Sequence, residues 1–170
     1  DGAGAVVLAA SDDPERGVMS VHLHADGRFA DELCCNYPSS AEMPRVRPER
    51  LADGAQFPHM NGRNVFKHAS LRMPETVLEA LSAHGLTPRD LKLLIPHQAN
   101  LRISEMVQQR LELRDDQVMN NIQRYGNTTA ASIPIALDEA VESGRIVPGD
   151  LVCMAAFGAG FTWGSALLRW

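Results

Sequence analysis

Basic residues are not in excess in this sequence, and long hydrophobic runs do not occur. The 170 residues include 16 Lys and Arg against 21 Asp and Glu, which gives a net charge of -5. A chain of this kind has no basic footprint for nucleic acid. No apolar run approaches the roughly 18 residues that cross a bilayer. Neither nucleic acid nor a membrane is therefore expected as a partner.

Cysteine is also scarce. The three cysteines, Cys34, Cys35 and Cys153, are an odd number without the spacing of a metal site, and adjacent Cys34 and Cys35 cannot easily pair with each other. We therefore expect a reduced, cytoplasmic setting. Apolar residues make up 45% and charged residues 22%, which is ordinary for a soluble globular protein. The length suits one domain with a substantial core.

Two patterns imitate ligand sites that we do not predict. His22 and His24 share one face of an expected strand, and with Asp26 they resemble a metal site. Two ligands on one strand are weak evidence, so no metal is predicted. The glycine turn FGAGFTWG, residues 157–164, is not a dinucleotide fingerprint because a strand follows it rather than a helix. No metal or organic cofactor is expected.

The chain reads as alternating strands and helices, which predicts an α/β fold with helices packed on a mixed sheet. Residues 36–58 hold four of the ten prolines without periodicity and predict an irregular loop or flap. Pro74 is expected to kink or restart its helix, and Pro134 fits only a first helical turn. The expected strands are 5–10, 17–25, 91–95, 118–122, 151–157 and 161–168, and the expected helices are 63–83, 99–111 and 129–143.

Polar side chains gather in three turns at the ends of these elements. IPHQAN lies between a strand and a helix, RYGNTTAAS lies before the next helix, and FGAGFTWG joins two strands. In an open α/β sheet, ligands bind outside the carboxyl ends of the strands, where such turns meet. The three turns therefore predict one shared site.

His97 and Asn127 suit the stabilisation of a negatively charged oxygen. An imidazole at a helix N-terminus is discouraged from taking a second proton, so His97 is expected to stay neutral and to donate a hydrogen bond. Asn127 would be a second neutral donor, and the N–H of Ala159 in the glycine turn a third. Donors of this kind, aimed at one point, predict a site that stabilises an enolate.

The motifs PHQAN, GNTTAAS and FGAGFTWGSAL resemble the C-terminal half of the β-ketoacyl-acyl carrier protein synthase III family, which initiates fatty acid synthesis. DGAGAVVL and HLHADG resemble the central segment of the same family. The resemblance implies a thiolase-like layered fold with the last strands of the N-terminal half at the start of the chain. It divides the chain into residues 1–30, which end that half, and residues 31–170, the C-terminal half-domain.

The resemblance also implies the site residues. His97 and Asn127 match the family's catalytic histidine and asparagine, and Ala159 matches the backbone N–H of the oxyanion hole, where glycine is often found. The substrates implied are a coenzyme A thioester and a phosphopantetheine thioester. Positions matching their tunnel are Met60, Gly62, Phe66, Ala99 and Asn100, and positions matching the basic rim that meets acyl carrier protein are Lys67 and Arg102.

The nucleophilic cysteine of the family has no counterpart here, because no cysteine lies in a strand-to-helix turn. The chain begins at DGAGAVVL, on the threshold of an apolar run, so we expect the N-terminal half to exist as a second chain or as sequence outside this one. Without it, an apolar sheet face would be exposed. The complete enzyme is expected to be a homodimer that acts with acyl carrier protein.

The function implied is a decarboxylating condensation of an acetyl-CoA-like primer with malonyl-acyl carrier protein. Two alternatives stay open. One is a specialised thiolase-like synthase of secondary metabolism, since primer choice depends largely on the other half. The other is a non-catalytic partner subunit, whose mark would be loss of His97 or Asn127.

Overall fold

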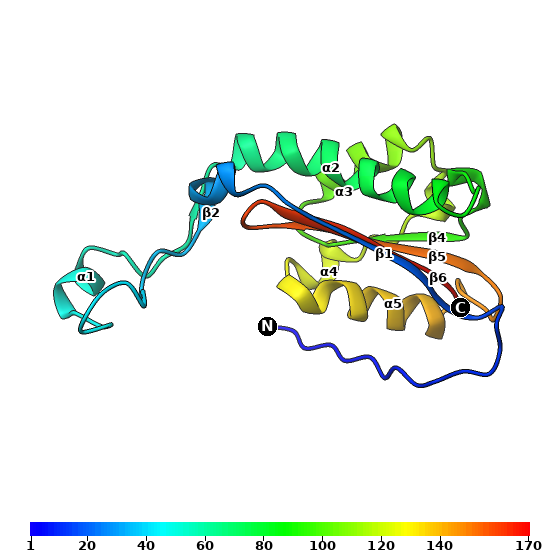
Figure 1. Cartoon of the computed structure of the whole chain (residues 1–170), viewed down its shortest axis with the longest axis horizontal. Helices are drawn as coiled ribbons and strands as arrows, with labels where there is room; N and C mark the ends of the chain where they lie inside the picture. Colours follow the sequence, from blue (N-terminus) through cyan, green and yellow to red (C-terminus); the bar gives the residue numbers. More distant parts are fainter.

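The computed structural model describes residues 1–170, and its centre is a four-stranded mixed sheet (Figure 1). The strands β1 (Gly17–Ala25), β4 (Leu93–Pro96), β5 (Leu151–Gly158) and β6 (Thr162–Arg169) lie in the order β1-β6-β5-β4. β6 is antiparallel to both of its neighbours, whereas β4 and β5 are parallel. The carboxyl ends of β4 and β5 therefore lie at the same edge of the sheet.

Helices cover both faces of this sheet. α2 (Gly62–Ser82) and α3 (Leu101–Arg110) lie on one face, and α5 (Ser132–Glu142) lies on the other (Figure 1). None of the helices has an apolar stretch of the length that a bilayer crossing requires. The short elements are α1 (Pro48–Ala52), α4 (Ile122–Tyr125), β2 (Leu33–Cys34), β3 (His59–Met60) and the 3₁₀ turns Gly27–Glu32, Pro88–Asp90, Asp115–Gln117 and Thr129–Ala131.

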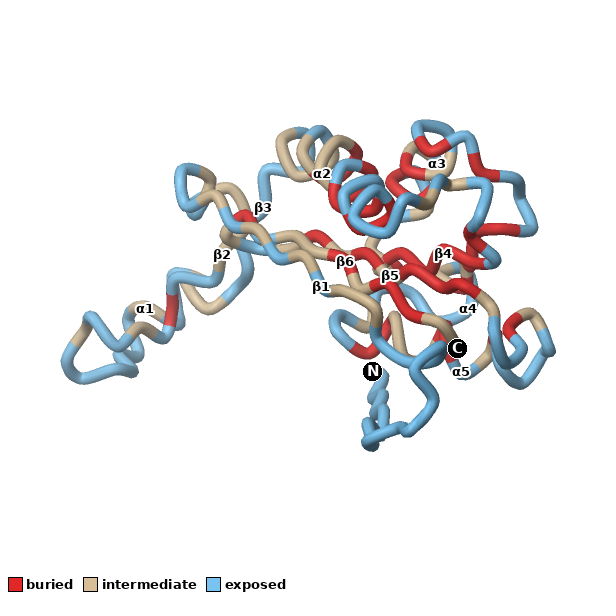
Figure 2. Tube along the Cα trace, turned by 45° about the vertical axis from the view of Figure 1, so that its right-hand side comes forward, coloured by how far each residue is buried: buried red, intermediate tan, exposed pale blue.

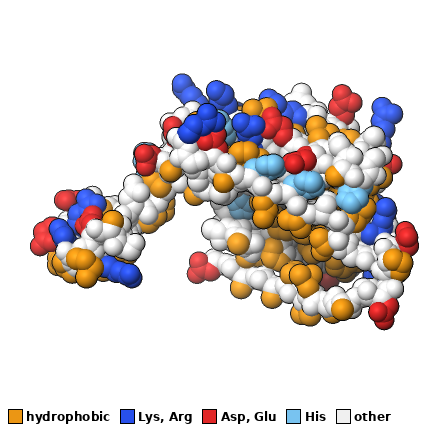
Figure 3. Space-filling view, viewed as in Figure 1, with side chains coloured by type: hydrophobic (Ala, Val, Ile, Leu, Met, Phe, Trp, Pro, Cys, Tyr) orange, Lys and Arg blue, Asp and Glu red, His pale blue; other side chains and the backbone are white.

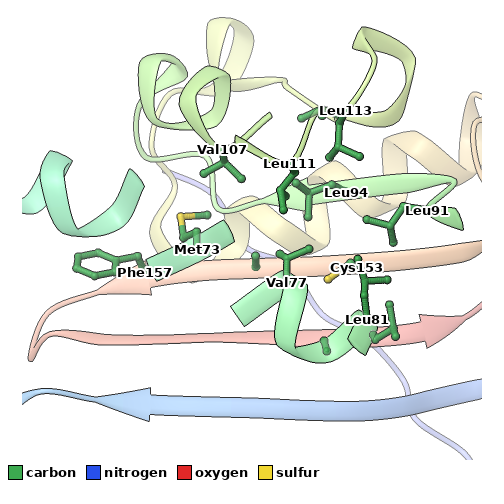
Figure 4. Close-up of a cluster of buried hydrophobic side chains, with 14 of the residues drawn as sticks. Met73, Val77, Leu81, Leu91, Leu94, Val107, Leu111, Leu113, Cys153 and Phe157 are labelled. Atoms are coloured by element: carbon green, nitrogen blue, oxygen red, sulfur yellow. The ribbon is translucent and has the colours of Figure 1, made fainter. Parts of the chain in front are cut away.

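The face beneath α2 and α3 holds the larger hydrophobic core. Figure 4 shows side chains of both helices meeting those of the sheet. Val77 and Leu81 of α2 and Leu94 of β4 are fully buried there. Burial of one such side chain contributes roughly 1.5–3 kcal/mol, so these contacts hold the layers together. A smaller core under α5 includes Ile95, Val152, Ala136, Leu137 and Leu168.

The helix predicted over residues 63–83 is confirmed as α2. It continues through Pro74 as one element, so a restart at that residue is wrong. Met73 and Val77 are buried beside Pro74, and their packing offsets the one helical hydrogen bond that a proline cannot make. Gly85 follows with a φ of +66°, and the Leu86 N–H donates to the Leu81 carbonyl, as in a glycine-ended helix.

Two strands predicted from apolar runs do not form. Residues 5–10 have no strand beside them, so their N–H and C=O groups have no ladder to join, and the segment runs exposed past α5 (Figure 1). Residues 118–122 make a single bridge, between Val118 and Leu94. The next residues turn away, and the N–H of Asn121 donates to the side chain of Gln98.

The second face of β1 and β6 is not covered by α5. Val21 and Leu23 of β1 are 54% and 78% exposed, and the tube in Figure 2 is pale or intermediate along this strand but buried along β4 and β5. Hydrophobic atoms gather below the strands in Figure 3, above the N-terminal segment. β1 pairs with β6 along its length, so strands from residues 1–30 and from residues 31–170 share one sheet.

Residues 35–58 form an arm that extends away from the sheet (Figure 1). The arm is irregular apart from α1, as its prolines predict. Tyr37 is its one buried residue; its hydroxyl bonds the backbone of Arg47, and Arg50 lies over its ring at 5.5 Å. β2 and β3 pair at the base of the arm and return the chain to α2.

Candidate active site

The three polar turns predicted from the sequence meet at one cavity. His97 directly follows β4, Ala159 lies in the turn between β5 and β6, and Asn127 lies between α4 and α5. All three line a cavity of about 1110 Å³. The parallel pairing of β4 with β5 brings the first two turns to the same edge. The three turns therefore lie together at one cavity, as a shared site would require.

His97 is held by its backbone and by its ring. Its N–H donates to the Ala155 carbonyl at 2.8 Å, which extends the β4–β5 ladder by one residue. Its Nδ1 lies 2.7 Å from the Ser132 hydroxyl. Burial lowers the pKa of His97 below the usual value of an imidazole, so the ring is neutral at pH 7.

The structure adds burial as a cause of this neutral state. We expected the N-terminus of the following helix to discourage protonation, but α3 begins four residues later, at Leu101, with Asn100 as its N-cap. The Asn100 Oδ1 accepts the N–H of Arg102 at 3.0 Å. The helix terminus is thus capped by a side chain, and burial of the ring is the cause that lowers the pKa of His97.

Gln98 supports the turn and was given no role from the sequence. Its Nε2 donates to the carbonyls of Pro96 and Met119, and its Oε1 accepts the N–H groups of Asn121 and Ile122. A side chain amide can make about four such bonds, so this buried residue is fully satisfied within the chain. Gln98 therefore ties the end of β4 to the segment that leads toward Asn127. The sequence feature that could have indicated this supporting role is the position of a glutamine next to an apolar run.

The side-chain amide of Asn127 uses its oxygen within the turn and leaves its amino group without a partner in the chain. Its Oδ1 accepts the N–H of Thr129 at 2.9 Å, so the amide oxygen is used in the turn. Its Nδ2 donates to no group within the chain and is free for a ligand. Asn127 both caps its turn and contributes a donor to the cavity.

The glycine turn explains why alanine is accepted at position 159. Gly160 has a φ of +132°, and a Cβ there would lie 2.8 Å from the Thr162 side chain. Glycine is required at that position. Ala159 has no positive φ, so a methyl group causes no backbone strain. Its N–H, outside both strands, makes no hydrogen bond within the chain.

The predicted tunnel residues lie at the same cavity, and one of the two predicted docking residues, Arg102, contacts its wall. The lining includes Met60, Gly62, Phe66, Ala99 and Asn100. Arg102 is not in the lining, but its guanidinium lies over the Phe66 ring at 5.8 Å. Lys67 is exposed on α2, outside the cavity lining. The cavity thus has a mainly apolar wall, with the Arg102 guanidinium at its edge.

The remaining sequence candidates lie elsewhere. His24 Nε2 and His22 Nδ1 approach the Glu79 carboxylate on α2 at 2.6 and 3.3 Å, while Asp26 pairs with Arg28 instead. His22, His24 and Asp26, which resemble a metal site in the sequence, therefore do not point to one common position. Cys153 is buried in β5, and burial raises the pKa of its thiol to about 12, which leaves no thiolate at neutral pH.

Known proteins similar to this chain share one description. A family model described as 3-oxoacyl-[acyl-carrier-protein (ACP)] synthase III C terminal matches residues 81–170. β-Ketoacyl-[acyl-carrier-protein] synthase III of Roseiflexus sp. (strain RS-1) is 49% identical over 100% of this chain, which covers 51% of that protein. Its counterpart in Sodalis glossinidius is 49% identical over 99% of this chain, with 50% of that protein covered. The chain thus spans about half the length of the curated relatives it matches.

Solved structures agree with this match. The β-ketoacyl-[acyl carrier protein] synthase III of Thermus thermophilus has a TM-score of 0.80 at 44% identity, over 93% of this chain and 47% of that one. The synthase III of Aquifex aeolicus has a TM-score of 0.81 at 37% identity, over 95% of this chain and 46% of that one. The priming β-ketosynthase of the R1128 polyketide pathway has a TM-score of 0.75 at 34% identity, over 93% of this chain and 46% of that one.

These structures confirm the predicted fold class, helices over the mixed sheet of a thiolase-like half. The turns that carry Asn127 and Ala159, and the loop that carries His97, all lie within the residues matched by the family model. The chain belongs to the 3-oxoacyl-[acyl-carrier-protein] synthase III C-terminal family.

Proposed function

We propose that this chain forms half of a decarboxylating condensing enzyme that initiates fatty acid synthesis. The enzyme joins an acyl primer, carried by coenzyme A, to malonyl-acyl carrier protein. The products are a 3-oxoacyl-acyl carrier protein, carbon dioxide and free coenzyme A. The names of the relatives support this reaction, and the cavity supports the part played by this chain.

The reaction divides into two steps. First, a cysteine thiolate outside this chain attacks the primer thioester and expels coenzyme A. Second, the malonyl group loses carbon dioxide, and the electron pair of the broken C–C bond passes into an enolate. The enolate carbon then attacks the acyl-cysteine carbonyl and expels the cysteine thiolate. The second step needs donors placed where the enolate oxygen acquires its charge.

His97 and Asn127 meet that need, and their common cavity is the observation that carries the proposal. Each has a side chain donor that is free of partners within the chain: Nδ2 in Asn127, and the ring nitrogen opposite Ser132 in His97. His97 is neutral because of its burial, so it donates a hydrogen bond without adding a charge. Ala159 adds a backbone N–H, which we assign to the oxyanion of the acyl-transfer step.

The cavity wall suits a long thioester arm. Met60, Phe66 and Ala99 present apolar surface to a phosphopantetheine chain, while Gly62 and Asn100 leave room and polar contacts beside it. We assign Arg102 and Lys67, next to this mouth, to docking of the acidic carrier protein. The stacking of Arg102 on Phe66 supports its place at the edge of the tunnel.

The exposed face of β1 and the lack of a nucleophilic cysteine in this chain indicate which partners it needs. We propose that the N-terminal half of the enzyme covers the exposed face of β1, where Val21 and Leu23 lie, and brings the nucleophilic cysteine to the cavity. The complete enzyme would act as a homodimer in the cytoplasm, where the three free cysteines of this chain stay reduced. Hydrogen-bond donors supply the catalysis, so no metal or organic cofactor takes part.

The test separates the two steps in the complete enzyme. His97→Ala and Asn127→Ala should each lower malonyl decarboxylation and condensation by about 10²-fold or more, because the loss of one such donor costs about 3 kcal/mol. Acyl transfer to the cysteine, measured by mass spectrometry with labelled acyl-CoA, should survive both changes. Normal condensation by either variant would overturn the assignment.

A specialised synthase of secondary metabolism is the second candidate. The likeness to a priming β-ketosynthase of a polyketide pathway favours it. Both candidates use the same His97 and Asn127 chemistry and differ in the primer. Turnover of a panel of acyl-CoA primers separates them, since a housekeeping enzyme should prefer a short primer such as acetyl-CoA. A non-catalytic subunit is disfavoured because both catalytic side chains are present at the cavity.

A further inference from the structure

The Ser132 hydroxyl touches the one functional side chain of the cavity that can exist in two neutral forms. A neutral imidazole carries its proton on either Nδ1 or Nε2, and the hydrogen bond made by one nitrogen decides which. In His97 the nitrogen with a partner is Nδ1, at 2.7 Å from the Ser132 Oγ. Nε2 makes no hydrogen bond within the chain, and the ring lines the cavity.

The direction of that bond follows from the other partner of Ser132. A hydroxyl has one proton to donate and two lone pairs that accept. The backbone N–H of Gln98 donates to the same Oγ at 3.2 Å. This N–H has no alternative role, because an amide nitrogen is always a donor. One lone pair of the Oγ is therefore occupied, and Nδ1 is the only other group that Ser132 Oγ contacts by a hydrogen bond.

Suppose that Nδ1 carried the proton. Ser132 Oγ would then accept from both N–H groups, and its own proton would point to no acceptor. Ser132 is only 2% exposed, so water does not replace the missing partner. A buried donor without an acceptor is disfavoured. With the hydroxyl donating to Nδ1, all three groups are satisfied at once.

We propose that Ser132 is a positioning residue: its hydroxyl donates to Nδ1 of His97 and so fixes the imidazole proton on Nε2, the nitrogen that faces the cavity. This assigns a role to the first residue of α5, which lies 35 positions beyond the histidine. The use of that Nε2–H group in catalysis rests on the proposed condensing function. The assignment of the His97 tautomer does not depend on that function.

The position of Ser132 in the fold suits this role. The Gln98 N–H comes from the same loop as His97, so one hydroxyl fixes both the loop and the ring. α5 packs on the sheet through Ala136 and Ala140, both fully buried, which leaves its first turn little freedom. The oxygen is therefore held by a rigid element rather than by a mobile side chain.

The first test reads the tautomer directly. In the complete enzyme labelled with ¹⁵N-histidine, the two ring nitrogens of His97 have different shifts when one carries the proton, and His97→Ala identifies the signals. The wild-type protein should show an Nε2–H imidazole. Ser132→Ala should move the signals toward a mixture or toward Nδ1–H, and Ser132→Thr, which keeps a hydroxyl, should restore the wild-type pattern.

Ser104→Ala is the matched control. Ser104 is also a buried serine in the first turns of a helix, and its hydroxyl donates to Asn120 instead of to the cavity. It should leave the His97 signals unchanged. An unchanged tautomer in Ser132→Ala, or an equal change in Ser104→Ala, would overturn the proposal.

The second test measures catalysis. Ser132→Ala should lower kcat for malonyl decarboxylation by about 10-fold or more, with KM almost unchanged, since a misplaced imidazole proton impairs the chemical step rather than binding. Ser132→Thr should restore most of the rate. If decarboxylation proves independent of His97 itself, the proposed function fails, while the tautomer measurement still decides the role of Ser132. A tautomer that shifts without any loss of rate would overturn the link between the two.

Discussion

The face of the sheet beneath α2 and the turns at its edge belong to the same strands and helices, and they differ in where their polar groups find partners. On the face beneath α2, the hydroxyls of Thr76 and Ser165 lie 3.0 Å apart, and Ser165 donates to the Thr76 carbonyl at 2.8 Å. These groups are satisfied inside the protein and serve its stability. At the cavity, where the turns meet at the edge of the sheet, the donors of Asn127 and Ala159 bond to no group of the chain.

The apolar residues also differ between an enclosed region and an open region of the sheet. Leu94 is enclosed by two helices, whereas Leu23 on β1 is 78% exposed. A large exposed apolar surface rarely belongs to a finished monomer surface. The comparison teaches that the face beneath α2 and α3 is largely complete within this chain. In our proposal, the cavity at the turns receives thioester substrates, and a further layer of protein covers the other face of β1 and β6.

The largest expected effect is on the completed face. Leu94→Ala in the complete enzyme should lower the free energy of unfolding by about 2–5 kcal/mol, because it removes a fully buried side chain and leaves a cavity between α2, α3 and the sheet. Denaturant unfolding, followed by fluorescence, measures the change. A loss below about 1 kcal/mol would mean that this core collapses around the vacancy and is not close-packed.

A smaller effect sharpens the comparison on the open face. If another half of the enzyme covers β1, Leu23→Ala in the complete enzyme should cost about 2 kcal/mol, the value for an interior leucine. Leu78→Ala is the matched control, since Leu78 is exposed on the outer side of α2. It should change stability by no more than about 0.5 kcal/mol. Equal small losses for both variants would show that Leu23 faces solvent in the complete enzyme as well.

Much of the completed face was predictable from the sequence because its residues follow local rules. The stripe of α2 repeats at three- and four-residue steps, and Gly85 marks its end. β5 and β6 were predicted to within about one residue at each end by their apolar runs and the glycine turn between them. The strand predicted at 5–10 failed for a non-local reason: its pattern suits a strand, but no neighbouring strand is present to accept its hydrogen bonds.

The residues proposed to act at the cavity were predictable from the sequence, and the side chains that support them were not. His97, Asn127 and Ala159 lie in turns that topology brings to one edge, and the resemblance to a family names them. The hydroxyl of Ser132 and the amide of Gln98 act through contacts that depend on the packing of α5 against the loop after β4. The spacing of residues along the chain does not predict such contacts between distant segments. The burial that lowers the pKa of His97 could not be predicted from the sequence, since burial depends on the whole fold.

The smallest expected effect tests the outer edge of the completed face, where β1 meets α2. Glu79 binds His24 at 2.6 Å and His22 at 3.3 Å, and the hydrogen bond from His24, with burial opposing it, lowers the pKa of the Glu79 carboxyl. A carboxyl with a lowered pKa in the folded protein stabilises it above the unfolded-state pKa, and this stabilisation is lost as the pH falls. Because the Glu79 side chain is 44% exposed, solvent reduces this stabilisation of the folded protein to about 0.5 kcal/mol.

Glu79→Gln should therefore lower the free energy of unfolding by that amount at pH 7, and the difference in this free energy between the variant and wild type should narrow as the pH falls from about 5 toward about 3. Glu105→Gln, at an exposed site on α3 that makes no ion pair, should show no such pH dependence. A difference between Glu79→Gln and wild type that stays constant over this range would show that Glu79 joins β1 to α2 by packing rather than by its charge.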